Sequence, residues 1–135
     1  HVPMEHMDAA LGEIARVLKP GGLAWISEPV FAGDLNEVFC LFHNEKIVRE
    51  AAFAAIRKAV DDGRLRLEKQ LFFNTRSFFE SFDQFDRRMI QVTHTSHRLA
   101  PELYQRVKEK FESYLTPEGA TFLNPQRVDL LRKAG

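Results

Sequence analysis

The segment RVLKPGGLAWISEP, residues 16–29, constrains the fold more than any other part of the chain. In it, a helical pattern ends at a Lys-Pro-Gly-Gly sequence and an apolar run follows at once. Pro20 disfavours helix at Lys19, and Gly21 supplies the positive φ of a type II turn. The apolar run at 23–26 does not alternate with polar residues, which predicts a strand covered on both faces, as in a parallel α/β sheet. The segment therefore predicts the joint between a helix and a strand.

The residues before this turn have the pattern of a helix. Pro3 suits a first helical position. Acidic residues lie near the start and basic residues near the end, as the helix dipole favours. Apolar residues recur at helical spacing, at Met4, Met7, Leu11, Ile14 and Leu18.

The middle of the chain reads as helix followed by strand. Helical spacing and an alanine-rich stretch continue from Asp34 to about Val60, with a break near His43 and Asn44 into two helices. The sequence DDG at 61–63 ends this region. Apolar residues then alternate along 65–73, which predicts a half-buried strand with inward residues Leu65, Leu67, Leu71 and Phe73.

Two further helices follow this strand. Ser81 and Gln84 have the spacing of a capping box, and the apolar stripe after them predicts a helix that reaches His94. Pro101 begins another helix. The sequence TPEG at 116–119 predicts a turn that ends this helical region.

The sequence RVDLLRK at 127–133 predicts a final strand. Val128 and Leu130 would share one face of it. Pro125 marks either the boundary of this strand or a bulge, because proline cannot donate to a sheet ladder. We found no internal repeat, low-complexity tract or linker, so we predict one α/β unit over residues 1–135.

Composition limits the classes of function. The 135 residues suffice for one core, and 19 basic residues balance 19 acidic ones, so no net charge favours nucleic acid or an anionic membrane. The single cysteine, Cys40, excludes an internal disulfide and indicates a reducing compartment. No apolar run approaches a membrane span, and we predict a cytoplasmic protein. Twelve phenylalanines predict a phenylalanine-rich core rather than a hydrophobic ligand pocket.

Three segments together resemble the class I S-adenosylmethionine-dependent methyltransferases. The first, ARVLKPGG at 15–22, is similar to the helix that precedes the family's fifth strand, and LAWISE at 23–28 is similar to that strand. HVP at 1–3 looks like the loop after strand four. RVDLLRK looks like the seventh strand, antiparallel and inserted between strands five and six. The resemblance covers residues 1–36 and 127–133, and the helices between look like an acceptor-pocket insertion.

The resemblance does not extend to the family's cofactor-binding elements. The family holds the cofactor with a glycine-rich loop after strand one and an acidic residue after strand two, and neither is present here. The paired glycines Gly21 and Gly22 lie at the helix-to-strand joint, whereas ligands of open α/β sheets bind beyond the carboxyl ends of the strands. The fold class that we predict is therefore the C-terminal half of a Rossmann-like methyltransferase sheet (strands five, six and seven), with the N-terminal half missing.

Candidate site residues follow the fifth strand. Glu28 would lie at its ligand-facing end and could orient or deprotonate the hydroxyl or amine of an acceptor. It could equally be a structural carboxylate. Phe31, Asp34 and Asn36 in the next loop could line the acceptor pocket, although Asp34 also suits the N-cap of the next helix.

Histidines supply the other candidates. His94, His97 and Arg98 form the densest polar cluster, which could line the pocket or stabilise a helix C-terminus. No nearby cysteine or carboxylate completes a metal site with them. By the resemblance, His1 would border the methyl-transfer site. Cys40 and His43 are three residues apart. Cys40 lies within an apolar helical stretch, which favours a thiol that packs in the core over a thiol that acts as a nucleophile.

These features predict the C-terminal part of an S-adenosylmethionine-dependent methyltransferase with a small-molecule acceptor. The alternative is a non-catalytic α/β binding or dimerisation module. On the first hypothesis the chain alone binds S-adenosylmethionine negligibly. The edge of the strand at 23–27 would lack its neighbour, so we also expect the isolated chain to form a homodimer or to aggregate.

Overall fold

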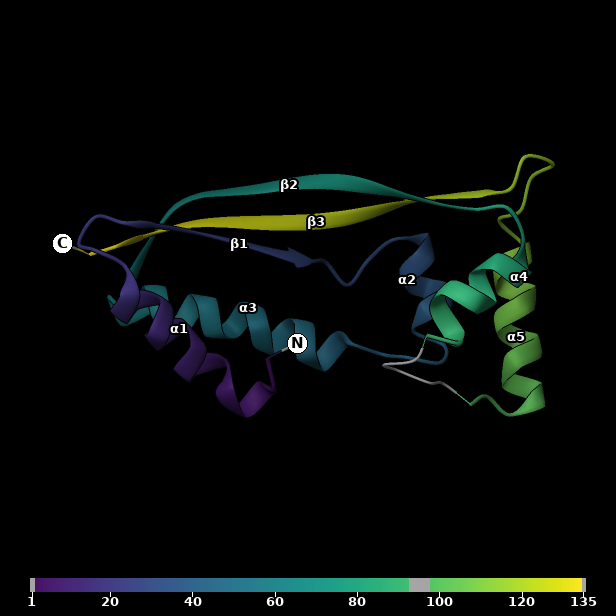
Figure 1. Cartoon of the computed structure of the whole chain (residues 1–135), viewed down its shortest axis with the longest axis horizontal. Helices are drawn as coiled ribbons and strands as arrows, with labels where there is room; N and C mark the ends of the chain where they lie inside the picture. Colours follow the sequence, from purple (N-terminus) through teal and green to yellow (C-terminus); the bar gives the residue numbers. More distant parts are fainter. Residues whose placement is uncertain (1, 93–97, 135) are drawn as a thin grey trace. The chain divides into compact units, whose positions relative to one another are not determined.

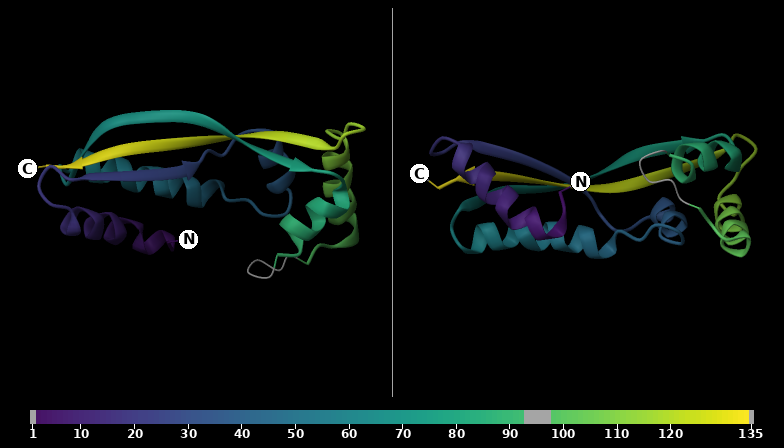
Figure 2. Two further views of the ribbon diagram at one scale, coloured as in Figure 1. Left: turned by 45° about the horizontal axis from the view of Figure 1, so that its top comes forward. Right: turned by 60° about the horizontal axis from the view of Figure 1, so that its bottom comes forward.

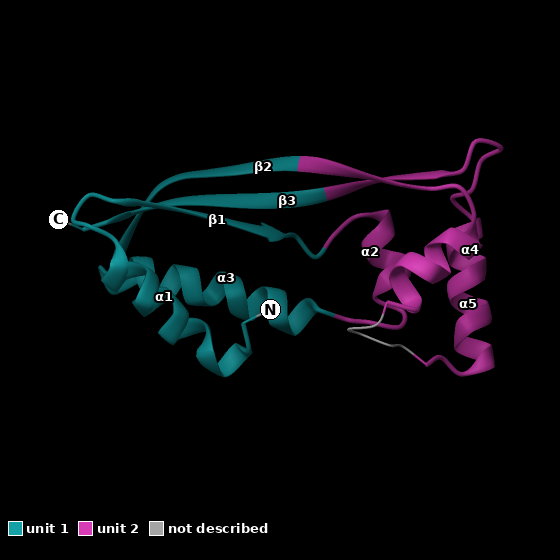
Figure 3. Cartoon of the chain, in the orientation of Figure 1, with its two compact units in different colours: residues 1–31, 45–73, 125–135 teal, residues 32–44, 74–124 magenta. Residues whose placement is uncertain are grey.

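The computed structural model describes residues 2–92 and 98–134 and has an α/β fold with an open, antiparallel, three-stranded sheet (Figure 1). The chain divides into two compact units (Figure 3). Unit 1 comprises 1–31, 45–73 and 125–135, and unit 2 comprises 32–44 and 74–124. The elements in chain order are η1 (Met4–His6), α1 (Met7–Val17), β1 (Leu23–Pro29), α2 (Asp34–Phe39), α3 (Lys46–Asp61), β2 (Leu65–Phe79), α4 (Phe82–Phe85), η2 (Asp86–Ile90, a π-helical turn), α5 (Pro101–Glu112) and β3 (Ala120–Lys133).

The predicted joint between helix and strand is confirmed. The helix ends at Val17, and the N–H of Gly22 donates to the carbonyl of Lys19 at 2.7 Å, which closes a turn with Gly21 at φ 77°. Gly22 is needed as well, because a Cβ there would lie 2.8 Å from the Lys19 carbonyl oxygen. Two backbone hydrogen bonds join this turn to Lys133, so it is fixed to the end of β3.

The sheet has the strand order β1-β3-β2. β3 pairs antiparallel with β1, so that Leu23 lies opposite Arg132 and Pro29 opposite Gln126. The expected position of the C-terminal strand between the other two is confirmed. β1 is consequently an edge strand.

Helices α1 and α3 cover one face of the sheet in unit 1 (Figures 1 and 2). Ala24 and Ile26 of β1 pack toward these helices, whereas Leu23 is 48% exposed and Trp25 is 64% exposed. The prediction that this strand is covered on both faces was wrong, because its side chains alternate and the helices cover only one set. The buried core beneath the helices comprises Leu11, Ala15, Ile56, Ala59, Leu65 and Leu131.

Strand β2 also departs from the prediction. It continues to Phe79, and only Leu65 of the four expected inward residues is buried. Leu67, Leu71 and Phe73 are 40–46% exposed, because the core under the helices reaches only Leu65 of these four, and β2 forms the other edge of the sheet. In β3, Pro125 lies inside the strand and therefore does not mark its boundary.

Unit 2 contains the predicted phenylalanine-rich core. The break between the two helices of 34–60 is confirmed, because α2 ends at Phe39 and α3 begins at Lys46. Ser81 caps α4 by accepting from the Gln84 N–H at 3.3 Å. The helix that was predicted to reach His94 ends at Ile90. The core of unit 2 comprises Val38, Phe79, Phe82, Phe85, Ile90, Val107, Phe111, Ala120 and Phe122.

Candidate functional site

A cavity of about 520 Å³ lies in unit 1 between α1, α3 and the end of β1. Glu28 reaches it because β1 turns Ile26 and Glu28 to the face that the two helices cover. Alanines on α1 and α3 leave the space that larger side chains would fill. The lining residues are Val2, Met7, Ala10, Leu11, Ile14, Ile26, Glu28, Pro29, Glu45, Val48, Arg49, Ala52, Ala55 and Ile56.

The charged groups of this cavity differ in their pairing. Arg49 and Glu45 form an ion pair at 3.0 Å, and each side chain is 18% exposed. Arg49 also donates to the carbonyl of Val30 at 3.2 Å. The half-buried carboxylate of Glu28 has no hydrogen bond or ion pair with any other residue in the described part of the chain. Glu28 is therefore the charge that a bound molecule could compensate.

A buried polar network lies on the same face of the sheet. Arg127, opposite Glu28 in the register, donates through Nε to Asp129 at 2.8 Å, and Gln70 donates to the other oxygen of that carboxylate at 2.8 Å. The Arg127 guanidinium packs over the Phe53 ring, 4.0 Å from its centroid. Its Nη2 atom is buried without a hydrogen-bond partner among the described residues.

The sequence pattern of β3 did not predict this network. Val128 and Leu130 do share a face of β3, but Arg127, Asp129 and Leu131 occupy the face that α1 and α3 cover. The alternation of two charged residues with apolar residues in RVDLLRK was the available signal. Helices cover one face of this central strand, so charged residues on that face become buried. They can be buried there because Arg127 and Asp129 are close enough to pair with each other.

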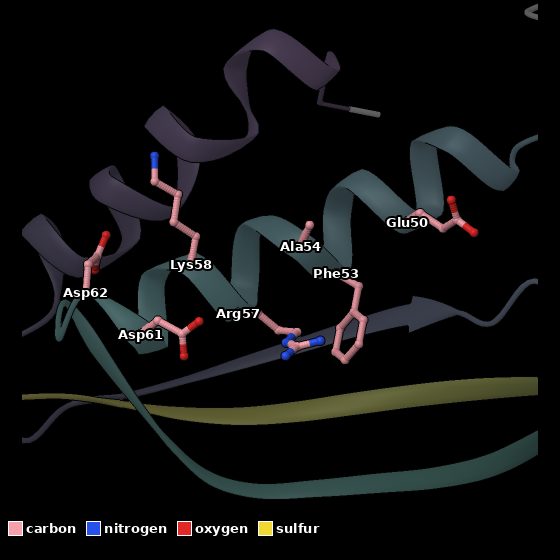
Figure 4. A pocket seen from close by; sticks show the side chains of 7 residues that line it. All are labelled: Glu50, Phe53, Ala54, Arg57, Lys58, Asp61 and Asp62. Atoms are coloured by element: carbon pink, nitrogen blue, oxygen red, sulfur yellow. The ribbon is translucent and has the colours of Figure 1, made fainter.

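A second hollow of about 590 Å³ lies along α3 (Figure 4). Several of its charged groups already have partners, since Lys58 pairs with Asp8 at 3.4 Å and Asp62 with Arg64 at 2.9 Å. Hydrogen bonds from Arg64 lower the pKa of both aspartates. Figure 4 shows Phe53 and Arg57 directed from α3 toward the strands. All of its lining residues except Phe53 are exposed, so this hollow is a solvated helix surface.

The predicted acceptor residues lie in both units. Glu28 and the half-buried Phe31 belong to unit 1, whereas Asp34 and Asn36 belong to unit 2. Asp34 is exposed and is the first residue of α2, and the N-cap is Gly33. The interpretation of Asp34 as the cap was therefore wrong, because Gly33, at φ 96°, occupies the N-cap position.

The predicted histidine candidates stay largely untested. His1, His94 and His97 lie outside the described residues, and Arg98 is exposed. The Cys40 thiol donates to the Glu37 carbonyl at 3.5 Å, and the His43 ring packs against Phe39, with centroids 5.1 Å apart. Within 2–92 and 98–134, no three His, Cys, Asp or Glu side chains are placed to hold a metal ion.

No protein-family model matches this sequence, and no curated protein is detectably similar to it. None of the helices in the described ranges combines the length and apolar character that a bilayer span requires. A functional assignment therefore depends on the geometry above and on the motifs of the sequence.

Proposed function

We propose that this chain is the C-terminal part of a cytoplasmic S-adenosylmethionine-dependent methyltransferase that acts on a small molecule. The observation that carries the proposal is the strand order β1-β3-β2, with β3 antiparallel to β1. Strands five, six and seven of that family would have this order, with the seventh in the middle. The Pro-Gly turn between α1 and β1 agrees with the same alignment.

The uncovered parts of β1 support this proposal. β1 has a free edge, and Leu23 and Trp25 expose large apolar side chains on the face away from α1 and α3. The interior strands of a Rossmann-like sheet have neighbours on both sides and helices on both faces. A fourth strand and the helices of a cofactor-binding half would cover this edge and this face.

The described chain contributes to acceptor binding and not to cofactor binding. It offers no glycine-rich turn to the cofactor, because Gly21 and Gly22 serve the turn between α1 and β1. Glu28, at the carboxyl end of β1 and in the cavity, has an unpaired carboxylate that can accept a hydrogen bond or a proton from an acceptor. Positioning of the acceptor is the larger part of this role, since proximity alone can supply much of the acceleration.

Calorimetry and turnover test the proposal. The isolated chain should bind S-adenosylmethionine negligibly, and a protein that extends upstream of His1 should bind it. In the extended protein, Glu28→Gln should reduce methyl transfer more than Cys40→Ser, because only Glu28 lines the cavity. Micromolar binding of the cofactor by the isolated chain, or full activity of the Glu28→Gln variant, would contradict the proposal.

The free edge of β1 also favours a second candidate, a non-catalytic binding or dimerisation module. A module of this kind needs no cofactor half. The same extended protein distinguishes the two candidates, since the module would bind no S-adenosylmethionine at any length.

A further inference from the structure

We infer that the cavity between α1, α3 and β1 binds a small molecule with an apolar body and a protonated amine, and that Glu28 is the counter-ion of the amine. The inference rests on the proposed function only in assigning this molecule as the methyl acceptor. The binding itself requires nothing beyond the cavity.

The size and walls of the cavity select the body of the ligand. About 520 Å³ lies within the range of roughly 300–1,000 Å³ that is typical of small-molecule sites. Leu11, Ile14, Ile26 and Ile56 form apolar walls, so a ring or a branched alkyl group would lose contact with water there.

The charged groups of the cavity indicate which polar group the ligand carries. Glu45 and Arg49 neutralise each other, and the Val30 carbonyl holds Arg49 further. Glu28 has no such partner among the described residues, and a ligand that covers it has to compensate its desolvation. An ammonium group does so with an ion pair, whereas an anionic ligand would meet repulsion.

Arg127 does not supply this compensation. It faces Glu28 across the β1–β3 ladder, but its guanidinium bonds to Asp129 at 2.8 Å and packs over Phe53. No ion pair between Arg127 and Glu28 is formed within 4 Å. The carboxylate of Glu28 is thus left for a ligand.

Three probes of one shape test the inference on the 135-residue chain: 3-phenylpropylamine, 3-phenyl-1-propanol and 3-phenylpropionate. Isothermal titration should show that the amine binds at least about tenfold more tightly than the alcohol, which corresponds to about 1.4 kcal/mol. The carboxylate should not bind measurably. Glu28→Gln should lower the affinity for the amine to that for the alcohol, and the control Glu50→Gln, on the exposed side of α3, should change nothing.

Equal binding of the amine and the alcohol by the unmodified chain would overturn the inference, and this comparison requires no variant to fold. Unchanged amine affinity in a folded Glu28→Gln variant, checked by circular dichroism, would overturn it too. Ala52→Phe, which fills the cavity, should abolish binding of the amine and the alcohol. Amine binding without methyl transfer in the extended protein would support this site and refute the proposed enzyme. Methylation of neutral acceptors alone would support the enzyme and refute the assignment of the amine as its acceptor.

Discussion

The two units have cores of different kinds. Unit 1 buries a small set of leucine, isoleucine and alanine side chains under two helices, together with the Arg127–Asp129 ion pair. Unit 2 packs phenylalanine rings against one another: Phe79 and Phe85 meet edge to face with centroids 5.3 Å apart, and Phe85 and Phe111 lie tilted with centroids 4.9 Å apart. Large rings bury much area in few residues. Unit 2 therefore has a continuous aromatic core, although Phe78 and Leu123 stay exposed, whereas unit 1 has a small aliphatic core and leaves Leu23 and Trp25 exposed.

The largest effect is expected from the centre of the aromatic core. Phe111→Ala should destabilise unit 2 by about 3–5 kcal/mol, since the ring is fully buried against four other phenylalanines. Chemical denaturation with hydrogen exchange of both units would measure it. The control Phe72→Ala, at an exposed ring, should change stability by less than about 0.5 kcal/mol. Equal losses in the two variants would show that the packing described for unit 2 is wrong.

The next effect concerns the ion pair of unit 1. Asp129→Asn should cost about 2–3 kcal/mol, because Arg127 keeps its charge and loses the carboxylate that compensates it. Urea unfolding followed in unit 1 is the measurement. Glu13→Gln is the matched control, since its pair with Arg16 is exposed and worth little. If both variants unfold at the same urea concentration, the network contributes nothing to stability.

A smaller effect should appear in self-association of the isolated chain. We propose that two copies pair through the free edge of β1, because an edge strand presents unpaired backbone groups and apolar side chains. Trp25→Lys should weaken this association at least about tenfold, or about 1.4 kcal/mol, in sedimentation equilibrium. Ile26→Lys would instead disturb the packing beneath α1 and α3, because Ile26 packs toward these helices. A chain that stays monomeric with slow exchange of the 23–27 amides would refute the pairing.

The smallest effect is acid sensitivity of unit 1. Hydrogen bonds from Arg64 lower the pKa of Asp8 and of Asp62, so their contribution to stability is complete above about pH 4 and is lost as pH falls through the lowered values. Arg64→Gln should flatten the dependence of the melting temperature on pH between 5 and 2. Added salt should weaken the effect, since these groups are exposed. If Arg64→Gln leaves the dependence of the melting temperature on pH unchanged, other groups cause the acid sensitivity.

The parts of the fold that local chemistry determines could be predicted from the sequence. The turn at Lys19–Gly22 follows from a Pro-Gly pair, and the cap at Ser81 follows from its spacing to Gln84. The exposure of Trp25 could not be predicted, because an apolar run shows that the side chains are hydrophobic but not which face of the strand other elements cover. Of the residues that line the cavity, only Glu28 was expected from the sequence to belong to a site. The cavity that receives it needs α1 and α3 side by side, which depends on contacts distant in sequence.

The order of the strands along the chain has a consequence for synthesis on the ribosome. The central strand β3 is the last of the three to be made, and β1 and β2 do not pair with each other. Until β3 emerges, both strands have no sheet partner, whereas the helices of unit 2 can already pack against Phe79, Phe82, Phe85 and Phe111, and of the phenylalanines in that core only Phe122 comes with β3. Late pairing across long stretches of chain is slow and exposes apolar strands to aggregation. The nascent chain should therefore need a chaperone for unit 1 for longer than for unit 2.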